Sequence, residues 1–451
     1  MQILATGIIP QLPGYELNPA TWLYLSIVLI VAVFFRFNRV WSLRNFDLLL
    51  LLSASPALYA LKNVASDGDG STHAHYAFLF TITGLIFIRL MLDPVLRRRP
   101  HFGQNLNAQG SAFLCIAAFM LLTMEAIHTD PPPVTAESVE RATDMILGTE
   151  HPAETSGDAA AGPVVPILCL PFNTVFQVDA SAAKAVAILA HLVVICGLLL
   201  VGRNLFGDLQ LGLGMATMYL LLPCTAYDVG EVHHVLPAAL IVWAIVFYRQ
   251  PLVSGVLLAL ACGMMFFPVF LVPLWAAYYG RRGGLRFAAA LLLVGAVVFT
   301  IVAMTSPGPE SVFRRTFGAI QIGELLSFNI PGPTAGFWTG DMNWYRFPVI
   351  VSFAIFLAAL TFWPRRMQFE QLSAYSAAVI VATQFWYPVH GGAYMLWYLP
   401  LLLIVVFRPR LVYAQTQEAA SQQSAKATSP GLSGPHAPRA KTPAGRFHLF
   451  R

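Results

Sequence analysis

Side chains that could do chemistry gather in short polar stretches between long apolar runs. The stretch SDGDGSTHAHY contains Asp67 and Asp69, followed by His73 and His75. Carboxylates and imidazoles can transfer protons, contact a charged leaving group or bind a metal ion. Asp67 and Asp69 have the spacing that opens a calcium loop, but the glutamate that closes the twelve-residue pattern is missing. We therefore expect no calcium at this stretch.

A second polar stretch, AYDVGEVHHV, contains Asp228, Glu231, His233 and His234 and opens another apolar run. Lipid does not account for four ionisable groups at the mouth of such a run, so the stretch is a candidate functional site. Its histidines could join those of the first stretch around a divalent metal ion. Neither pair has the i,i+4 spacing that places two imidazoles on one helix face. We expect no metal or other cofactor.

Other ionisable residues have structural interpretations. His191 lies alone in the run AILAHLVVICG and is interpreted as a core histidine with satisfied hydrogen bonds. Asp47 opens an apolar run beside Arg44, where the helix dipole favours a carboxylate. Polar residues in loops commonly need no function beyond solvation.

The composition indicates a polytopic membrane protein. Of 451 residues, 57% are hydrophobic and 11% are charged, whereas soluble domains contain about 25% charged residues. The net charge of +5 does not indicate a nucleic-acid partner, because the basic residues occupy short turns that orient membrane helices. The five cysteines lack metal-site spacing. The first twenty residues lack the basic region of a cleavable signal peptide.

The apolar runs predict an all-α bundle of about 11–13 membrane spans within residues 1–410. The expected spans are 20–36, 46–61, 76–92, 110–127, 182–201, 209–225, 235–248, 252–266, 267–279, 286–304, 347–363, 371–386 and 392–407. The count depends on Pro268, because a helix break there returns Arg281 and Arg282 to the side of Arg249. A re-entrant hairpin would do the same and leave eleven crossings.

Turns of two kinds alternate along the chain. The basic turns include Arg36, Arg89, Arg97, Arg203, Arg249, Arg281, Arg365 and Arg408. The acidic or histidine-bearing segments are 63–75, 128–181, 226–234, 305–346 and 387–391. The positive-inside rule places the basic turns in the cytoplasm. We therefore expect a multi-pass protein of the cell membrane with its N-terminus outside and its C-terminus cytoplasmic.

Three segments are not expected to span the membrane. The outer loop 128–181 is predicted to contain a short helix at 135–147 and to cover part of an outward cavity. The outer loop 305–346 is rich in proline and aromatic residues. Residues 411–451 are rich in Gln, Ser, Ala and Pro and are predicted to be a disordered cytoplasmic tail.

The region from Gly230 to Arg286 has an ordered set of elements. The turn Gly230-Glu231-Val232-His233 comes first, then an apolar helix, the turn Gln250-Pro251, a small-residue helix, a break at Pro268, and an Arg-rich turn. This order resembles the polyprenyl-phosphate-sugar-dependent glycosyltransferases of family 87, which have the GT-C fold. The match covers about an eighth of the chain, and two residues depart from the family pattern. Glu231 replaces the usual glutamine, and Met265 replaces the usual lysine.

The resemblance implies a membrane glycosyltransferase that moves a hexose from a polyprenyl-phosphate donor to a glycan or lipid acceptor at the outer face. It implies that a carboxylate in an early outer loop, Asp67 or Asp69, is the general base. Side chains of neighbouring turns would bind the substrate, and the candidates are Asp228, Glu231, His233, His234, His73 and His75. The acidic stretch follows the second span rather than the first, which an additional N-terminal span would explain. No nucleic acid is expected as a partner.

Two other functions remain open. A transporter or flippase for a lipid-linked or small solute would carry ionisable residues at the bilayer midplane, where His191 is the main candidate. A non-catalytic membrane protein with a GT-C-like fold would be consistent with Met265 and with the displaced acidic stretch. A shared outward cavity for Asp67, Asp69, Glu231 and His233 would favour the enzyme.

Overall fold

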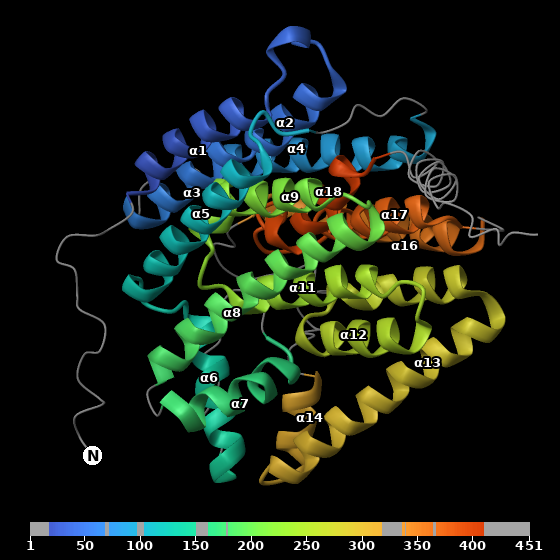
Figure 1. The fold of residues 1–451 in the computed structure, drawn as a ribbon. Coiled ribbons are helices and arrows are strands. Elements are labelled where there is room, and N and C mark those ends of the chain that lie inside the picture. Colours follow the sequence, from blue (N-terminus) through green and yellow to red (C-terminus); the bar gives the residue numbers. More distant parts are fainter. Residues whose placement is uncertain are drawn as a thin grey trace, which may run out of the picture. The chain divides into compact units, whose positions relative to one another are not determined.

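The computed structural model describes residues 18–67, 72–96, 103–149, 161–176, 179–317, 336–338, 340–363 and 367–409. Every regular element within these ranges is a helix, which confirms the predicted all-α class (Figure 1). The described residues belong to one compact unit. The expected tail at 411–451 lies outside them and stays a prediction.

The helices fall into an N-terminal and a C-terminal series. The first series is α1 (Pro19–Phe34), α2 (Leu43–Ser53), α3 (Ser55–Asp67), α4 (His73–Leu92), α5 (Ala108–His128), α6 (Pro133–Leu147), α7 (Val164–Phe176), α8 (Asp179–Leu200) and α9 (Leu209–Leu221). The second is α10 (Pro223–Tyr227), α11 (Val232–Val246), α12 (Pro251–Met264), α13 (Leu271–Thr305), α14 (Pro309–Phe317), α16 (Arg346–Phe362), α17 (Phe369–Thr383) and α18 (Leu399–Phe407).

Five helices among the described residues are long and apolar enough to cross a membrane. They are His73–Val95, Ala108–His128, Ala180–Leu205, Phe267–Thr305 and Met342–Phe362. Shorter apolar helices accompany them, at Pro19–Phe34, Val164–Phe176, Leu209–Leu221, Val232–Val246 and Pro251–Met264. These helices fit the predicted membrane protein, whereas the count of 11–13 spans and the orientation of the termini stay predictions.

The outer surfaces of α13 and α16 are strongly apolar. Met304 on α13 is 82% exposed, and Phe362 on α16 is 84% exposed. Leu292 and Ile355 are exposed on the same two helices. Soluble proteins rarely leave contiguous bulky apolar side chains uncovered. These two helices therefore present a surface suited to lipid.

The centre of the unit contains α8, α9, α11, α17 and α18. Every residue of α18 from Leu399 to Phe407 is buried. The π-helical turn Val201–Leu205, which follows α8, approaches α9 closely where Gly202 faces Gly212, and a Cβ atom at Gly202 would lie 2.4 Å from the Gly212 Cα. Only small residues allow two backbones to come this close.

Several predicted span boundaries are wrong in detail, and proline accounts for two of them. The expected span 46–61 is two helices, α2 and α3, because Pro56 disfavours a helical conformation just before it. The expected span 392–407 contains a short 3-10 helix, Met395–Trp397, and the nine-residue α18, which begins beside Pro400. In the loop 128–181 the predicted helix is present as α6, and α7 is an additional helix that was not predicted.

The predicted helix break at Pro268 is present. A single 3-10 turn, Phe267–Phe270, separates α12 from α13. The ring of Tyr278 lies 6.3 Å from that of Tyr248, so the chain returns to the end where α12 began. The expected spans 267–279 and 286–304 correspond to two helical segments of α13, which meet at a sharp break at Gly280 with φ +64° and ψ −171°.

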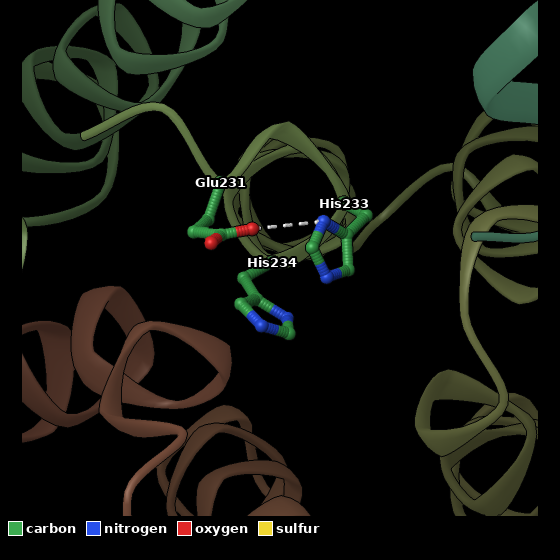
Figure 2. A group of neighbouring side chains, drawn as sticks. All are labelled: Glu231, His233 and His234. Carbon is green, nitrogen blue, oxygen red and sulfur yellow. Dashed lines mark ion pairs between the residues drawn. The ribbon is translucent and has the colours of Figure 1, made fainter. Parts of the chain in front are cut away.

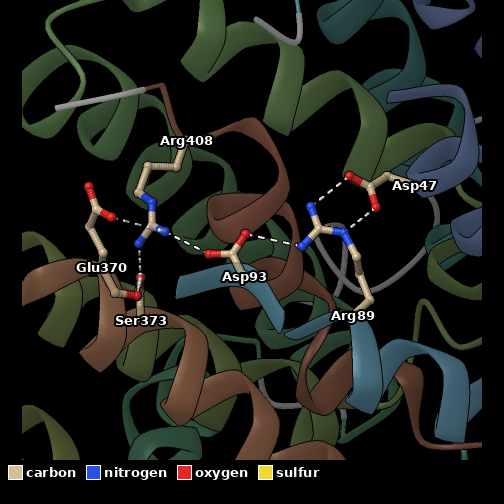
Figure 3. A network of polar contacts seen from close by, with 6 residues as sticks. All are labelled: Asp47, Arg89, Asp93, Glu370, Ser373 and Arg408. Carbon is tan, nitrogen blue, oxygen red and sulfur yellow. Dashed lines mark hydrogen bonds and ion pairs between the residues drawn. The ribbon is translucent and has the colours of Figure 1, made fainter. Parts of the chain in front are cut away.

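A buried ion network ties together turns from the predicted basic set (Figure 3). The Arg89 guanidinium donates to both Asp47 oxygens, at 2.6 and 2.9 Å, and to Asp93 at 3.1 Å. Arg408 donates to the other Asp93 oxygen at 2.6 Å and to Ser373 at 2.9 Å. Asp47 is thus the ion-pair partner of Arg89, which corrects its interpretation as a helix-terminal carboxylate.

Segments of the acidic set also contact one another. The Thr135 hydroxyl donates to the Gly230 carbonyl at 2.9 Å, and the Arg315 guanidinium donates to the Thr149 carbonyl at 2.7 Å. The alternation of turns along the chain therefore corresponds to two groups of contacts within the described residues, one at each end of the helices.

Candidate functional site

Three residues of the second polar stretch meet at the start of α11 (Figure 2). Glu231 precedes the helix, and His233 and His234 lie in its first turn. One donor atom of each side chain lies within 4.8 Å of the others. Glu231 Oε2 is 3.3 Å from His233 Nδ1, and the two imidazole rings lie 3.9 Å apart between centroids. Three of the four ionisable residues of this stretch therefore lie together in space, and their functional role stays a prediction.

The three side chains of the cluster differ in their exposure to solvent. The His233 side chain is fully buried, whereas that of Glu231 is 20% exposed. His234 is buried on the other side of the group. Glu231 is therefore the member that solvent or a substrate can reach.

An indole group fixes the ring of His234. Trp397 Nε1 donates a hydrogen bond of 2.8 Å to His234 Nδ1. Trp397 itself lies between Phe267 and Tyr394, with stacked ring centroids 4.6 and 4.4 Å away. Because an indole N–H can only donate, Nδ1 must offer its lone pair, and the single hydrogen of the neutral ring lies on Nε2.

This hydrogen bond decides how well the cluster suits a metal ion. Three protein ligands would match a catalytic zinc site. A metal on His234 would have to displace Trp397 from Nδ1 or remove the remaining ring hydrogen from Nε2. Without His234, only Glu231 and His233 remain. The arrangement favours hydrogen bonding and proton exchange over metal binding, and the expectation that the protein needs no metal stays a prediction.

A cavity of about 190 Å³ borders the cluster through Glu231. Its wall contains four carboxylates and two ammonium groups, which are Glu125, Asp130, Asp228, Glu231, Lys62 and Lys184. The surrounding helices are α1, α3, α5, α8 and α10. The site therefore combines proton acceptors with cations that can contact an anionic group.

Both lysines are held by backbone carbonyls. Lys62 donates to the carbonyl of Tyr227, and its ammonium lies 3.8 Å from Asp228. Lys184 donates to Ile127 from the opposite wall. Burial raises the pKa of the Tyr227 phenol above its usual value, so the hydroxyl stays protonated at neutral pH.

The loop 128–181 borders this cavity at its first residues. Asp130, Pro131 and Pro132 belong to the cavity wall. Thr135 donates to the carbonyl of Gly230 at 2.9 Å, and a Cβ atom at Gly230 would lie 2.6 Å from the Pro132 ring. The loop thus contacts the turn at 228–231, as predicted, and a glycine is required where they meet.

Of the two aspartates in the first polar stretch, Asp67 alone belongs to a described helix. Helix α3 ends at Asp67, whose side chain is not among the described groups, and Asp69 lies outside the described residues. His73 and His75 begin α4. His73 stacks on Phe337 at 5.6 Å. Neither histidine belongs to the group formed by the second stretch.

Two lysines of the cavity were not recognised as site residues, although the sequence contains a signal for them. The chain's lysines are Lys62, Lys184, Lys426 and Lys441. The first two stand at the predicted outer ends of spans, where the positive-inside rule does not place basic residues. The last two belong to the predicted tail.

A third histidine near the cluster was also not singled out. His390 Nδ1 shares a hydrogen bond with the Tyr76 hydroxyl, and its backbone has φ +50°. Its ring lies 6.3 Å from Tyr394, which in turn lies 4.9 Å from His234. His390 therefore connects the start of α4 to the cluster. No local pattern predicts this contact, because Tyr76 and His390 are 314 residues apart.

His191 behaves as predicted. Its two ring nitrogens contact the Tyr219 hydroxyl at 2.8 Å and the Val229 carbonyl at 3.0 Å. It is buried and lies outside the cavity wall. We retain its interpretation as a core residue.

The chain was compared with protein-family models, curated proteins and solved structures, and none of them matches. The resemblance to family 87 therefore remains a prediction based on the residues from 230 to 286.

Proposed function

We propose that this chain is an integral membrane glycosyltransferase that transfers a hexose from a polyprenyl-phosphate donor to an acceptor hydroxyl. The observation that carries the proposal is the cavity that combines Lys62 and Lys184 with Asp228 and Glu231. Such a transfer needs a base for the hydroxyl proton and positive charge for the departing phosphate. A membrane protein that keeps both at the end of its helices is suited to a donor anchored in lipid.

The position of α3 supports the proposal. Asp67 follows Lys62 by five residues, which corresponds to a rise of about 7.5 Å along a helix. The end of α3 therefore lies close to the wall of the cavity, which contains Lys62. An early-loop carboxylate could reach a substrate bound there, as the resemblance to family 87 implies.

An apolar groove supports a lipid donor. It has a volume of about 380 Å³ and lies between α12 and α13, with Gly263, Phe266 and Phe299 in its wall. The Phe266 ring packs 5.6 Å from Trp397, which bonds to His234. A hydrocarbon chain in the groove would thus end close to the aromatic side of the cluster.

A direct assay tests the proposal. The purified protein in detergent is incubated with farnesyl-phosphate glucose and farnesyl-phosphate mannose, together with membrane lipids or glycans as acceptors. Mass spectrometry then detects farnesyl phosphate and the glycosylated acceptor. We expect both products from at least one donor.

Lysine variants identify the cavity as the site. Lys62→Met and Lys184→Met should each lower kcat/KM about 10-fold or more, because a hydrogen bond from a charged group contributes about 1.5–3 kcal/mol. Lys426→Met in the tail is the matched control and should leave the rate unchanged. Donor binding without product, or movement of the intact donor across vesicles, would instead support the non-catalytic or transporter alternative.

A further inference from the structure

We infer that Glu231, rather than Asp67 or Asp69, accepts the proton of the attacking hydroxyl, and that His233 and His234 hold its carboxylate in position. The inference rests on the proposed function and assigns its catalytic base. Of the three clustered side chains, Glu231 alone belongs to the cavity wall. The fully buried His233 cannot meet a substrate directly.

The other carboxylates of the wall have different surroundings. Asp228 lies 3.8 Å from the Lys62 ammonium, which pairs with its carboxylate. Glu125 accepts a hydrogen bond from the Thr129 hydroxyl at 3.1 Å, and Asp130 is exposed. Glu231 instead faces two imidazoles, which can hold its orientation and exchange a proton with it.

Glu231 meets the histidines through one carboxylate oxygen. Its Oε2 atom lies 3.3 Å from His233 Nδ1, and its side chain is 20% exposed in the cavity wall. In the proposed complex the other oxygen, Oε1, contacts the acceptor hydroxyl. His234 packs against the His233 ring and is itself fixed by Trp397. Both histidines are therefore positioning residues, and Glu231 is the catalytic residue.

The step balances without a further reactant. The acceptor hydroxyl oxygen forms a bond to the anomeric carbon while its proton passes to Glu231 Oε1. The bond from the anomeric carbon to the phosphate oxygen breaks, and its electron pair leaves with the lipid phosphate. Lys62 and Lys184 stabilise that charge. The proton on Glu231 then returns to solvent through the cavity.

The farnesyl-phosphate assay separates the candidate bases. Glu231→Gln should lower kcat about 10²–10⁴-fold, which is the usual contribution of a general base. Asp67→Asn and Asp69→Asn should each change kcat less than about fivefold. Thermal unfolding with and without donor shows whether each variant folds and binds. Formate should restore part of the rate of Glu231→Ala, because a small carboxylate can occupy the vacated position.

Two substitutions of His233, one conservative and one not, test its positioning role. The amide nitrogen of Asn lies where His233 has Nδ1, so His233→Asn should keep most of kcat. His233→Ala should lower kcat about 10-fold with little change in KM and should shift the acid limb of the pH profile. Equal losses in both variants, with unchanged profiles, would contradict this role.

Failure of the Glu231 assignment and failure of the proposed function give different results. A large loss in Asp67→Asn or Asp69→Asn, with Glu231→Gln active and formate without effect, overturns the assignment of Glu231 and leaves the enzyme proposal standing. A wild-type protein that releases no product from any donor overturns the enzyme proposal and this inference together.

Discussion

At the scale of single residues, buried charges in this protein have partners from distant parts of the chain. Asp93 is nearly inaccessible and accepts hydrogen bonds from two arginines, Arg89 and Arg408. Neither arginine could leave the contact without exposing an uncompensated buried charge. The network therefore constrains the end of the bundle where it lies.

Replacing Asp93 should be strongly destabilising. Asp93→Asn removes the charge between two buried guanidinium groups, which typically costs about 3–5 kcal/mol. Glu137→Gln is the control, because Glu137 forms a partly exposed i,i+4 pair with Arg141 on one helix, and such pairs contribute about 0.3–0.5 kcal/mol. Thermal unfolding in detergent, followed by tryptophan fluorescence, compares the two. Similar melting temperatures would contradict the importance of the network.

The sequence predicted some of these residues and misread others. Glu231, His233 and His234 were predictable because four ionisable groups precede an apolar run within seven residues. Arg89 was interpreted only as a residue that orients the membrane helices. Its partner Asp47 is 42 residues away, and no local pattern reports a contact over that separation.

At the scale of elements, helix breaks depend on proline in two places and on glycine in a third. Pro56 and Pro268 interrupt apolar runs, and proline geometry made the second of these breaks predictable. The kink of α13 instead occurs at Gly280, whose φ of +64° and ψ of −171° are nearly exclusive to glycine. The run LWAAYYGRRGG contains several glycines, so the sequence did not identify which one bends the helix.

Two alanine substitutions in α13 should show whether backbone conformation or side-chain packing determines the need for glycine at Gly280. A Cβ atom at Gly280 or at Gly295 would meet no neighbour within 4 Å. Gly280→Ala should nevertheless destabilise the protein by about 1–3 kcal/mol, because its backbone conformation is strained for alanine. Gly295→Ala should be neutral or stabilising by up to about 1 kcal/mol, since alanine favours a regular helix. Melting temperatures of both variants test this, and a neutral Gly280→Ala would refute the strain.

At the scale of the whole membrane domain, the alternation of basic and acidic turns corresponds to contacts. Basic-set residues meet in the network of Figure 3, and acidic-set residues surround the cavity that contains Glu231. The sequence predicted this grouping because charge, unlike side-chain packing, can be read along the chain. It did not predict α7 or the short length of α18. The apolar residues of these segments indicate that they are buried, but they do not indicate where each helix begins and ends.

Reporter fusions test the predicted orientation. Fusions after residues 98, 282 and 420 should report the cytoplasm, and a fusion after residue 150 should report the outside, because basic turns favour the cytoplasmic side. Paired reporters that are active on opposite sides of the membrane provide the internal control. An outside signal at 98 or 282 would reverse the orientation and place the cavity on the cytoplasmic face.

The bond between Arg408 and Asp93 also has a consequence for biosynthesis. These residues are 315 positions apart, and Arg408 follows the last described helix. A ribosome therefore completes nearly the whole membrane domain before Asp93 can receive its second partner. Until then the nascent chain carries an incompletely neutralised buried carboxylate, so assembly of this end must wait until Arg408 has been synthesised. A message truncated before residue 408 would yield a chain that membrane quality control can recognise by this one missing arginine.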